Sequence, residues 1–309
     1  MRWTVPTRAA LAVLLGTGVV VSRPAPVTAA GFVEAYPVTA AAMRAAGPPY
    51  ADWTAEGRRF LLFDPRGDGR AVEVLGDLAT AEHIVVLVPG VGTTLRDFDR
   101  GLAGVARRAP AVQAAALHAE LRATDPDARI AVLAWLGYDT PDGVVAAAGP
   151  APAHRGAAAL RAALRELAAH RPSATVTVVG HSYGALVAGL AAHDAPPQLT
   201  DVVTLGGIGT GADRATAFGP ARRIWAAEAP DDWIRRVPPV RLPGLGHGRR
   251  PADPEFGARA LPAADVHGHD GYLVRGTSTL AAVASVVLTG AAEAPAPVRL
   301  AATTTGAAR

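Results

Sequence analysis

Two reactive side chains are missing from this sequence altogether: it contains neither cysteine nor lysine. Without cysteine the protein has no thiolate nucleophile, no sulfur-ligated structural zinc and no disulfide, so its stability has to come from a packed core. Without lysine it lacks the amine that a Walker-type phosphate loop or a Schiff-base enzyme requires. These absences exclude several classes of enzyme before any motif is considered.

Charged and aromatic residues are also scarce, at 18% and 5% of the chain, whereas 50% of the residues are hydrophobic. This proportion excludes disorder of the whole chain, and 309 residues are enough for one large domain or two small ones. All 30 basic residues are arginine, and the net charge of +3 is spread along the chain without a basic run. We therefore expect no nucleic-acid partner.

The first 30 residues have the pattern of an export signal. Arg2 and Arg8 precede the apolar run 9–21, and small residues follow it. As a helix this run rises about 20 Å, short of the roughly 30 Å core of a bilayer. The alternative is an uncleaved anchor with a helix extending to Pro24. We predict a signal peptide at 1–30, a secreted or cell-envelope protein, and membrane contact only through this segment.

The remaining chain is predicted to form a folded domain at 31–290, followed by a disordered tail at 291–309. Residues 31–80 form its N-terminal extension, with a short helix ending at Gly47 and a β-hairpin around the sequence DPRGDGR. From residue 83 onward, short apolar runs alternate with amphipathic segments, which is typical of a mostly parallel sheet with helices on both faces. The predicted strands are 83–88, 129–135, 175–180, 201–206 and 222–229, and the predicted helices are 97–123, 154–170, 185–193 and 277–288.

Serine is rare, with five in the chain, and Ser182 lies between Gly180 and Gly184 at the junction of a predicted strand and helix. The sequence Gly-x-Ser-x-Gly in this context predicts a very sharp turn that holds the serine in a strained conformation with its hydroxyl above the sheet edge. The glycines allow strand and helix to approach closely. The alternative interpretation is an ordinary helix N-cap.

A serine nucleophile requires a base to remove its proton and an acid to orient that base. In the chain order Ser, Asp, His, the favoured histidine is His269, just before the final helix, and His267 is the alternative. His247 lies in a glycine-rich loop that we expect to cover or line the site. His181 is expected to point away from Ser182 into the packing.

The acid is expected after the strand at 222–229, where Asp231 and Asp232 are adjacent. We favour Asp232, although either carboxylate can cap the short helix that follows, so that one would cap the helix and the other orient the histidine. An oxyanion hole needs two preorganised N–H donors. We predict the backbone amides of Tyr183, directly after the nucleophile, and of Val91, in the loop after the first buried strand.

Several segments together carry a family resemblance: VLVPGVGTTL, AWLGYDTP, TVVGHSYGALVAG, DVVTLGGIGTG, WAAEAPDDWI and the GH before DGYL. They resemble the α/β-hydrolase superfamily and, more narrowly, a family of unknown function found mostly in actinobacteria. The resemblance covers about residues 59–290 and implies that Ser182, Asp232 and His269 are the matching triad positions. In similar sequences the glycine-rich loop before Arg249 is often followed by an aspartate, which is absent here.

These observations predict an α/β-hydrolase fold and an exported serine hydrolase. We expect it to act as a monomer on a small-molecule or lipid-like carboxylic ester through an acyl-enzyme, without metal or cofactor. Amide hydrolysis and acyl transfer remain alternatives, as does a catalytically silent fold that binds a ligand or the cell envelope. No Gly-x-Gly-x-x-Gly or second metal-ligand cluster favours a dinucleotide or metal enzyme. The long irregular stretches 135–152 and 238–256 are expected to shape the pocket.

Overall fold

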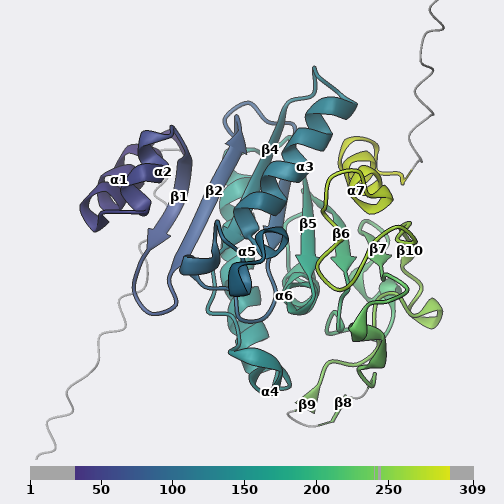
Figure 1. Ribbon diagram of the computed structural model, residues 1–309. Coiled ribbons are helices and arrows are strands. Elements are labelled where there is room, and N and C mark those ends of the chain that lie inside the picture. The colour runs from purple at the N-terminus through teal and green to yellow at the C-terminus, as the bar shows by residue number, and fades with distance from the viewer. Residues whose placement is uncertain (1–31, 240, 243–244, 293–309) are drawn as a thin grey trace, which may run out of the picture.

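Strands and helices alternate along most of the chain in the computed structural model, which describes residues 32–239, 241–242 and 245–292 (Figure 1). The predicted signal peptide and residues 293–309 of the predicted tail lie outside these ranges. The strands are β1 (Arg59–Asp64), β2 (Arg70–Gly76), β3 (His83–Val88), β4 (Ile130–Leu136), β5 (Thr175–His181), β6 (Leu199–Leu205), β7 (Arg223–Ala227), β8 (Arg241–Leu242), β9 (Leu245–Gly246) and β10 (Arg259–Ala260). The α-helices are α1 (Phe32–Ala46), α2 (Tyr50–Ala55), α3 (Pro110–Thr124), α4 (Gly143–Ala147), α5 (Ala151–His170), α6 (Tyr183–Ala192) and α7 (Ser278–Thr289).

Eight of the described strands form one sheet in the order β1-β2-β4-β3-β5-β6-β7-β10. The six strands from β4 to β10 in this order run parallel, which confirms the predicted mostly parallel sheet. The predicted hairpin is present as the antiparallel pair β1 and β2. It continues the central sheet, because β2 also pairs antiparallel with β4 from Ala71, opposite Leu136, to Gly76, opposite Ala131.

Helices cover both faces of the sheet, and the alternation of side chains along the strands explains why. Along β3, Val86 belongs to the apolar cluster that includes residues of α5 and α6, whereas Val85 and Leu87 belong to the cluster with α3 and α7. Successive residues of a strand point to opposite faces, so a strand buried on both sides has to be apolar throughout. The amphipathic pattern of α5 is confirmed, since Leu160 and Leu164 are fully buried against the sheet.

The segment predicted as one helix at 97–123 is different in the structure. Short 3-10 turns at 95–97, 102–104 and 106–108 precede α3, which begins only at Pro110. Gly101 has a φ of 76°, and a Cβ at this position would lie 2.0 Å from the carbonyl oxygen of Val105, so the chain cannot continue as a helix there. Pro110 suits the first turn of a helix because its missing N–H has no partner at that position. β10, α2 and α4 were also not predicted.

The carboxyl ends of the parallel strands lie at one edge of the sheet. In Figure 1 the arrows of β5, β6 and β7 point toward the lower side of the molecule, where α4 and the short pair β8 and β9 lie. A hydrogen bond of 3.0 Å from the Gly246 amide to the Ala148 carbonyl joins these two segments. Loops at this edge are where parallel α/β sheets place their ligands.

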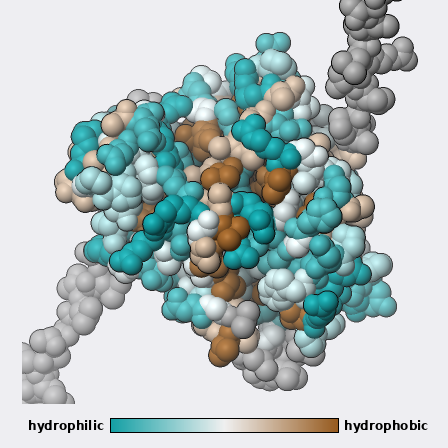
Figure 2. Space-filling model, in the orientation of Figure 1, coloured by the Kyte–Doolittle hydropathy of each residue, from teal (hydrophilic) through white to brown (hydrophobic). Residues whose placement is uncertain are grey.

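The surface facing the viewer in Figure 2 is mostly hydrophilic, with apolar residues gathered in a band down its middle. Within the described ranges, the large apolar side chains that are exposed are Val38, Val112, Val145, Trp233 and Val274. Over the same ranges, no helix combines the length and apolar character that crossing a membrane requires. Most of the apolar side chains of the described residues therefore lie in the two clusters on either side of the sheet.

Candidate active site

Ser182 occupies the turn between β5 and α6 with φ 55° and ψ −119°. Only Ala103 shares a positive φ among the described residues other than glycine. This confirms the predicted strain, which costs about 1–3 kcal/mol for such a backbone conformation. The Ser182 side chain makes no capping hydrogen bond to α6, so the alternative interpretation of an ordinary N-cap is wrong.

Glycines surround the turn because backbone segments meet there. A Cβ on Gly184 would lie 2.3 Å from the Val88 carbonyl oxygen, and one on Gly180 would lie 2.5 Å from the Gly184 carbonyl oxygen. A Cβ on Gly90 would lie 2.9 Å from the Cβ of Ser182, so the loop after β3 also approaches the serine closely. Any side chain at these positions would displace the turn.

Asp232 contacts His269, and Asp231 does not. The Nδ1 atom of His269 lies 2.8 Å from Oδ1 and 2.9 Å from Oδ2 of Asp232, which is 2% exposed. Asp232 also accepts a 2.8 Å hydrogen bond from the Ile234 amide and so caps the following turn itself. Asp231 accepts from the Gly268 amide at 2.9 Å. The expectation that the two carboxylates divide these roles is therefore wrong, because Asp232 performs both.

A tyrosine holds the carboxylate from the other side. The Tyr272 hydroxyl donates to Oδ2 of Asp232 at 2.5 Å and accepts from the Ala229 amide at 2.9 Å. Burial alone would raise the pKa of Asp232, but the hydrogen bonds from His269, Tyr272 and the Ile234 amide outweigh it, and the pKa lies below its ordinary value. Asp232 is therefore a carboxylate at neutral pH and the acceptor of the Nδ1 proton of His269.

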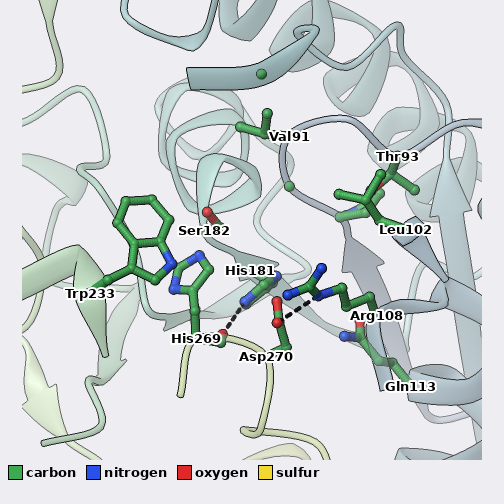
Figure 3. Close-up of a pocket in the computed structure, with 13 residues that line it drawn as sticks. Val91, Thr93, Leu102, Arg108, Gln113, His181, Ser182, Trp233, His269 and Asp270 are labelled. Carbon is green, nitrogen blue, oxygen red and sulfur yellow. Dashed lines mark hydrogen bonds and ion pairs between the residues drawn. The ribbon is translucent and has the colours of Figure 1, made fainter. Parts of the chain in front are cut away.

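The other ring nitrogen of His269, Nε2, is buried without a hydrogen-bond partner in the described part of the chain. Because Nδ1 faces the Asp232 carboxylate, Nε2 is the ring nitrogen left to exchange a proton with a substrate or with Ser182. His269 and Ser182 line the same cavity (Figure 3). A Cβ on Gly206 would lie 2.8 Å from Oδ2 of Asp232 and 3.1 Å from the His269 ring, so only glycine leaves room for this pair.

The alternative histidines lie elsewhere. The side chain of His267 is 90% exposed, with Nδ1 3.8 Å from a carboxylate oxygen of Asp231. His247 hydrogen-bonds to the Ala147 carbonyl at 2.6 Å and packs edge-on against Tyr183. It lines a second cavity beside Ser182, which confirms that its loop borders the site.

His181 does not turn away into the packing as expected. It lines the same cavity as Ser182, and its Nε2–H donates to the backbone carbonyl of His269 at 2.7 Å (Figure 3). Burial and the neighbouring His269 lower the pKa of His181 to about 4, so the ring is neutral at neutral pH. The expectation was wrong because the loop that carries His269 folds back over the end of β5, 88 residues away in sequence.

Several cavity residues were missed by the sequence analysis. Trp233 packs against His269 with ring centroids 4.7 Å apart, and it directly follows Asp232 in the sequence, which was the available signal. Arg108 and Gln113 had no such signal, because they belong to the segment predicted as a single helix. Arg108 donates from Nε to Asp270 at 2.6 Å across 162 residues, a contact that only the fold creates.

The two predicted oxyanion donors lie next to Ser182. Val91 lines the cavity together with Ser182, and Tyr183 is the first residue of α6. Within the described ranges, neither backbone amide donates to another protein group. The predicted pocket-shaping stretches are confirmed, since Gly143, Ala148 and Pro238 all line cavities at this site. Over those ranges, no group of three or more His, Cys, Asp or Glu side chains is placed to hold a metal ion.

Known proteins resemble this chain in sequence. The uncharacterized protein Rv2079 of Mycobacterium tuberculosis is 30% identical over 258 residues, covering 73% of this chain and 38% of that protein. The uncharacterized protein Mb0988c of Mycobacterium bovis is 32% identical over 205 residues, covering 61% of this chain and 76% of that protein. The chain thus spans 38% of the length of the first of these relatives.

Solved structures and a protein-family model complete the comparison. A carboxylesterase from Mesorhizobium loti is 16% identical with a TM-score of 0.44, covering 72% of this chain and 96% of that one. A family model described as alpha/beta hydrolase matches residues 64–242, more than half of the 309 residues. The chain therefore belongs to the α/β-hydrolase family.

Proposed function

We propose that the protein is an exported serine hydrolase that cleaves carboxylic esters through an acyl-enzyme. One observation carries the proposal: the buried, unpartnered Nε2 of His269, held by Asp232, borders the same cavity as the strained Ser182. The export of the protein rests on the pattern of residues 1–30, and its action as a monomer is part of the proposal. The mycobacterial relatives support membership of the narrower actinobacterial family.

In the proposed reaction, Ser182 Oγ attacks the ester carbonyl carbon while its proton passes to Nε2 of His269. The tetrahedral intermediate collapses when the bond to the alcohol oxygen breaks, and that oxygen takes the proton from Nε2. A water molecule then attacks the acyl carbon and gives a proton to Nε2. The bond to Ser182 Oγ breaks, Oγ takes the proton back from Nε2, and the carboxylic acid is released. Asp232 keeps the imidazole in the tautomer that each transfer requires.

The amides of Val91 and Tyr183 are the proposed donors to the negative oxygen of the tetrahedral intermediate. Tyr183 is the first residue of α6, where the positive end of the helix dipole adds to the effect. A Cβ on Gly90 would lie 2.9 Å from the Cβ of Ser182, and this close approach of the loop that carries Val91 supports the assignment. Removing one donor of this kind costs about 2.7–4 kcal/mol in the activation free energy.

Labelling with a fluorophosphonate probe tests the proposal directly. We expect one stoichiometric covalent adduct on Ser182, located by peptide mass spectrometry, together with turnover of p-nitrophenyl esters. A catalytically silent fold would neither take the label nor turn over any ester of the panel. Labelling of Ser182 without turnover of esters would instead direct the search toward amides or acyl transfer.

Replacing Tyr272 with phenylalanine is expected to lower kcat about tenfold, because Asp232 loses a charge-assisted hydrogen bond. The lost donor also raises the pKa of Asp232, so the loss of activity that follows protonation of this carboxylate at the acidic end of the kcat/KM profile begins at higher pH. Tyr36→Phe is the matched control, since the buried Tyr36 hydroxyl has no partner within the described ranges. An unshifted acidic limb in Tyr272→Phe would contradict this role.

A further inference from the structure

Two cavities of different character meet at Ser182. One, of about 220 Å³, is lined on one side by His181 and His269, and its other walls combine the polar side chains of Thr93, Arg108, Gln113 and Asp270 with the apolar Pro89 and Leu102. The other, of about 390 Å³, lies toward α4 and β9. Val91, Ser182 and Trp233 line both of them. A substrate whose reacting carbon sits at Ser182 would therefore extend into both cavities, one on each side of the scissile bond.

The second cavity is apolar. Its walls include Ala148, Ile208, Ile234, Val237 and Pro238, and no Asp, Glu or Arg of the described residues lines it. The Nε2 atom of its one histidine, His247, already hydrogen-bonds to the Ala147 carbonyl. A ligand group binds favourably to such a surface chiefly when the group is apolar, because binding removes apolar area from water.

The first cavity offers donors and acceptors side by side. Nε of Arg108 donates a hydrogen bond to Asp270 at 2.6 Å, and Nε2 of Gln113 donates one to the Arg107 carbonyl at 2.9 Å. Within the described ranges, the Arg108 Nη groups, the Gln113 Oε1 atom and the Thr93 hydroxyl have no protein partner. Figure 3 shows Arg108, Gln113 and Thr93 on the side of the cavity opposite Trp233. Because Arg108 is paired with Asp270, this wall suits neutral hydroxyl groups, which both donate and accept, better than a charged group.

The position of His269 decides which part of an ester enters which cavity. The imidazole has to protonate the departing alcohol oxygen, so the alcohol lies on the side of His269. His269 and His181 line the polar cavity and not the apolar one. The acyl chain is left with the apolar cavity.

We propose that the substrates are esters of a polyhydroxy alcohol with an apolar acyl chain, the alcohol binding against Thr93, Arg108 and Gln113 and the chain against Ala148 and Val237. This inference rests on the proposed ester hydrolysis and names the substrate class of the same site. Acylglycerols and acylated sugars share this chemistry.

Chain length tests the apolar cavity. With p-nitrophenyl esters, kcat/KM is expected to rise about fourfold per added methylene from acetate until the cavity is filled. Ala148→Phe fills part of the cavity and is expected to lower the octanoate-to-acetate ratio of kcat/KM at least tenfold. Ala158→Phe places the same side chain on the exposed surface of α5 and serves as the control. An octanoate-to-acetate ratio near one, or equal ratios in both variants, overturns the assignment of the acyl chain.

Hydroxyl groups on the alcohol test the polar cavity. Glycerol 1-monooctanoate and propyl octanoate have the same carbon skeleton, and we expect a kcat/KM at least about tenfold higher for the glycerol ester. Thr93→Val removes one hydroxyl and should reduce that preference about two- to tenfold, whereas the exposed Thr216→Val should not. A 6-octanoyl glucose arm distinguishes sugar from glycerol as the source of the alcohol.

The outcomes separate the two proposals. Hydrolysis of p-nitrophenyl esters with no preference for the glycerol ester, or a preference that Thr93→Val leaves intact, overturns the assignment of the alcohol and leaves the esterase activity standing. Absence of both labelling and hydrolysis overturns the proposed function itself.

Discussion

Replacing Ser182 with alanine is expected to reduce kcat for p-nitrophenyl ester hydrolysis about 10⁵- to 10⁶-fold, because the remaining groups cannot form the acyl-enzyme. Fluorophosphonate labelling should disappear in the same variant. Both are measured on purified protein, with near-UV circular dichroism confirming the fold. Retention of a tenth or more of the wild-type rate would remove Ser182 as the nucleophile.

The same position offers a variant that separates activity from folding. Ser182 has a φ of 55°, which glycine adopts without strain, whereas alanine keeps the Cβ that causes the strain. Ser182→Gly should relieve about 1–3 kcal/mol of strain, offset in part by the larger entropy of glycine in the unfolded chain. We therefore expect an inactive protein whose Tm is about 2–4 °C above wild type. A lower Tm would show that the serine hydroxyl itself stabilises the turn.

Replacing Asp232 with asparagine is expected to lower kcat about 10⁴-fold with little loss of binding. The carboxylate accepts from His269, Tyr272 and the Ile234 amide at once. An amide has one acceptor oxygen, and if its NH₂ group faces Nδ1, the histidine proton moves to Nε2. Nε2 would then carry a proton and could not accept the one from Ser182. Fluorophosphonate labelling should therefore slow in parallel with ester hydrolysis.

The neighbouring Asp231 supplies the control for this variant. Its carboxylate accepts from the Gly268 amide, and asparagine keeps an oxygen that can do the same. Asp231→Asn is expected to retain kcat within about threefold, since an exposed carboxylate contributes little. Equal losses in the two variants would mean that the loop before His269, and not the carboxylate on Nδ1, controls the rate.

Much of the fold could be predicted because its signals are local. The β3 run is apolar throughout since it is buried on both faces. The turn at Ser182 is recognisable from the flanking glycines, which the close packing of the backbone requires. The prediction of a helix at 97–123 failed because Gly101 has a φ of 76° and lies so close to the Val105 carbonyl that only glycine fits, which composition does not reveal.

The sequence by itself determined the order of the elements, the strained serine and a short set of histidines and carboxylates that follow the right strands. Only the tertiary structure decided among them: it brought Asp232, not Asp231, to His269, placed His181 under the His269 loop, and joined Arg108 to Asp270. The physical reason is that backbone conformation depends on neighbouring residues, whereas side-chain contacts at the carboxyl edge of the sheet depend on how separate loops pack together. The hydrophobic periodicity of one segment does not predict how that segment packs against distant loops.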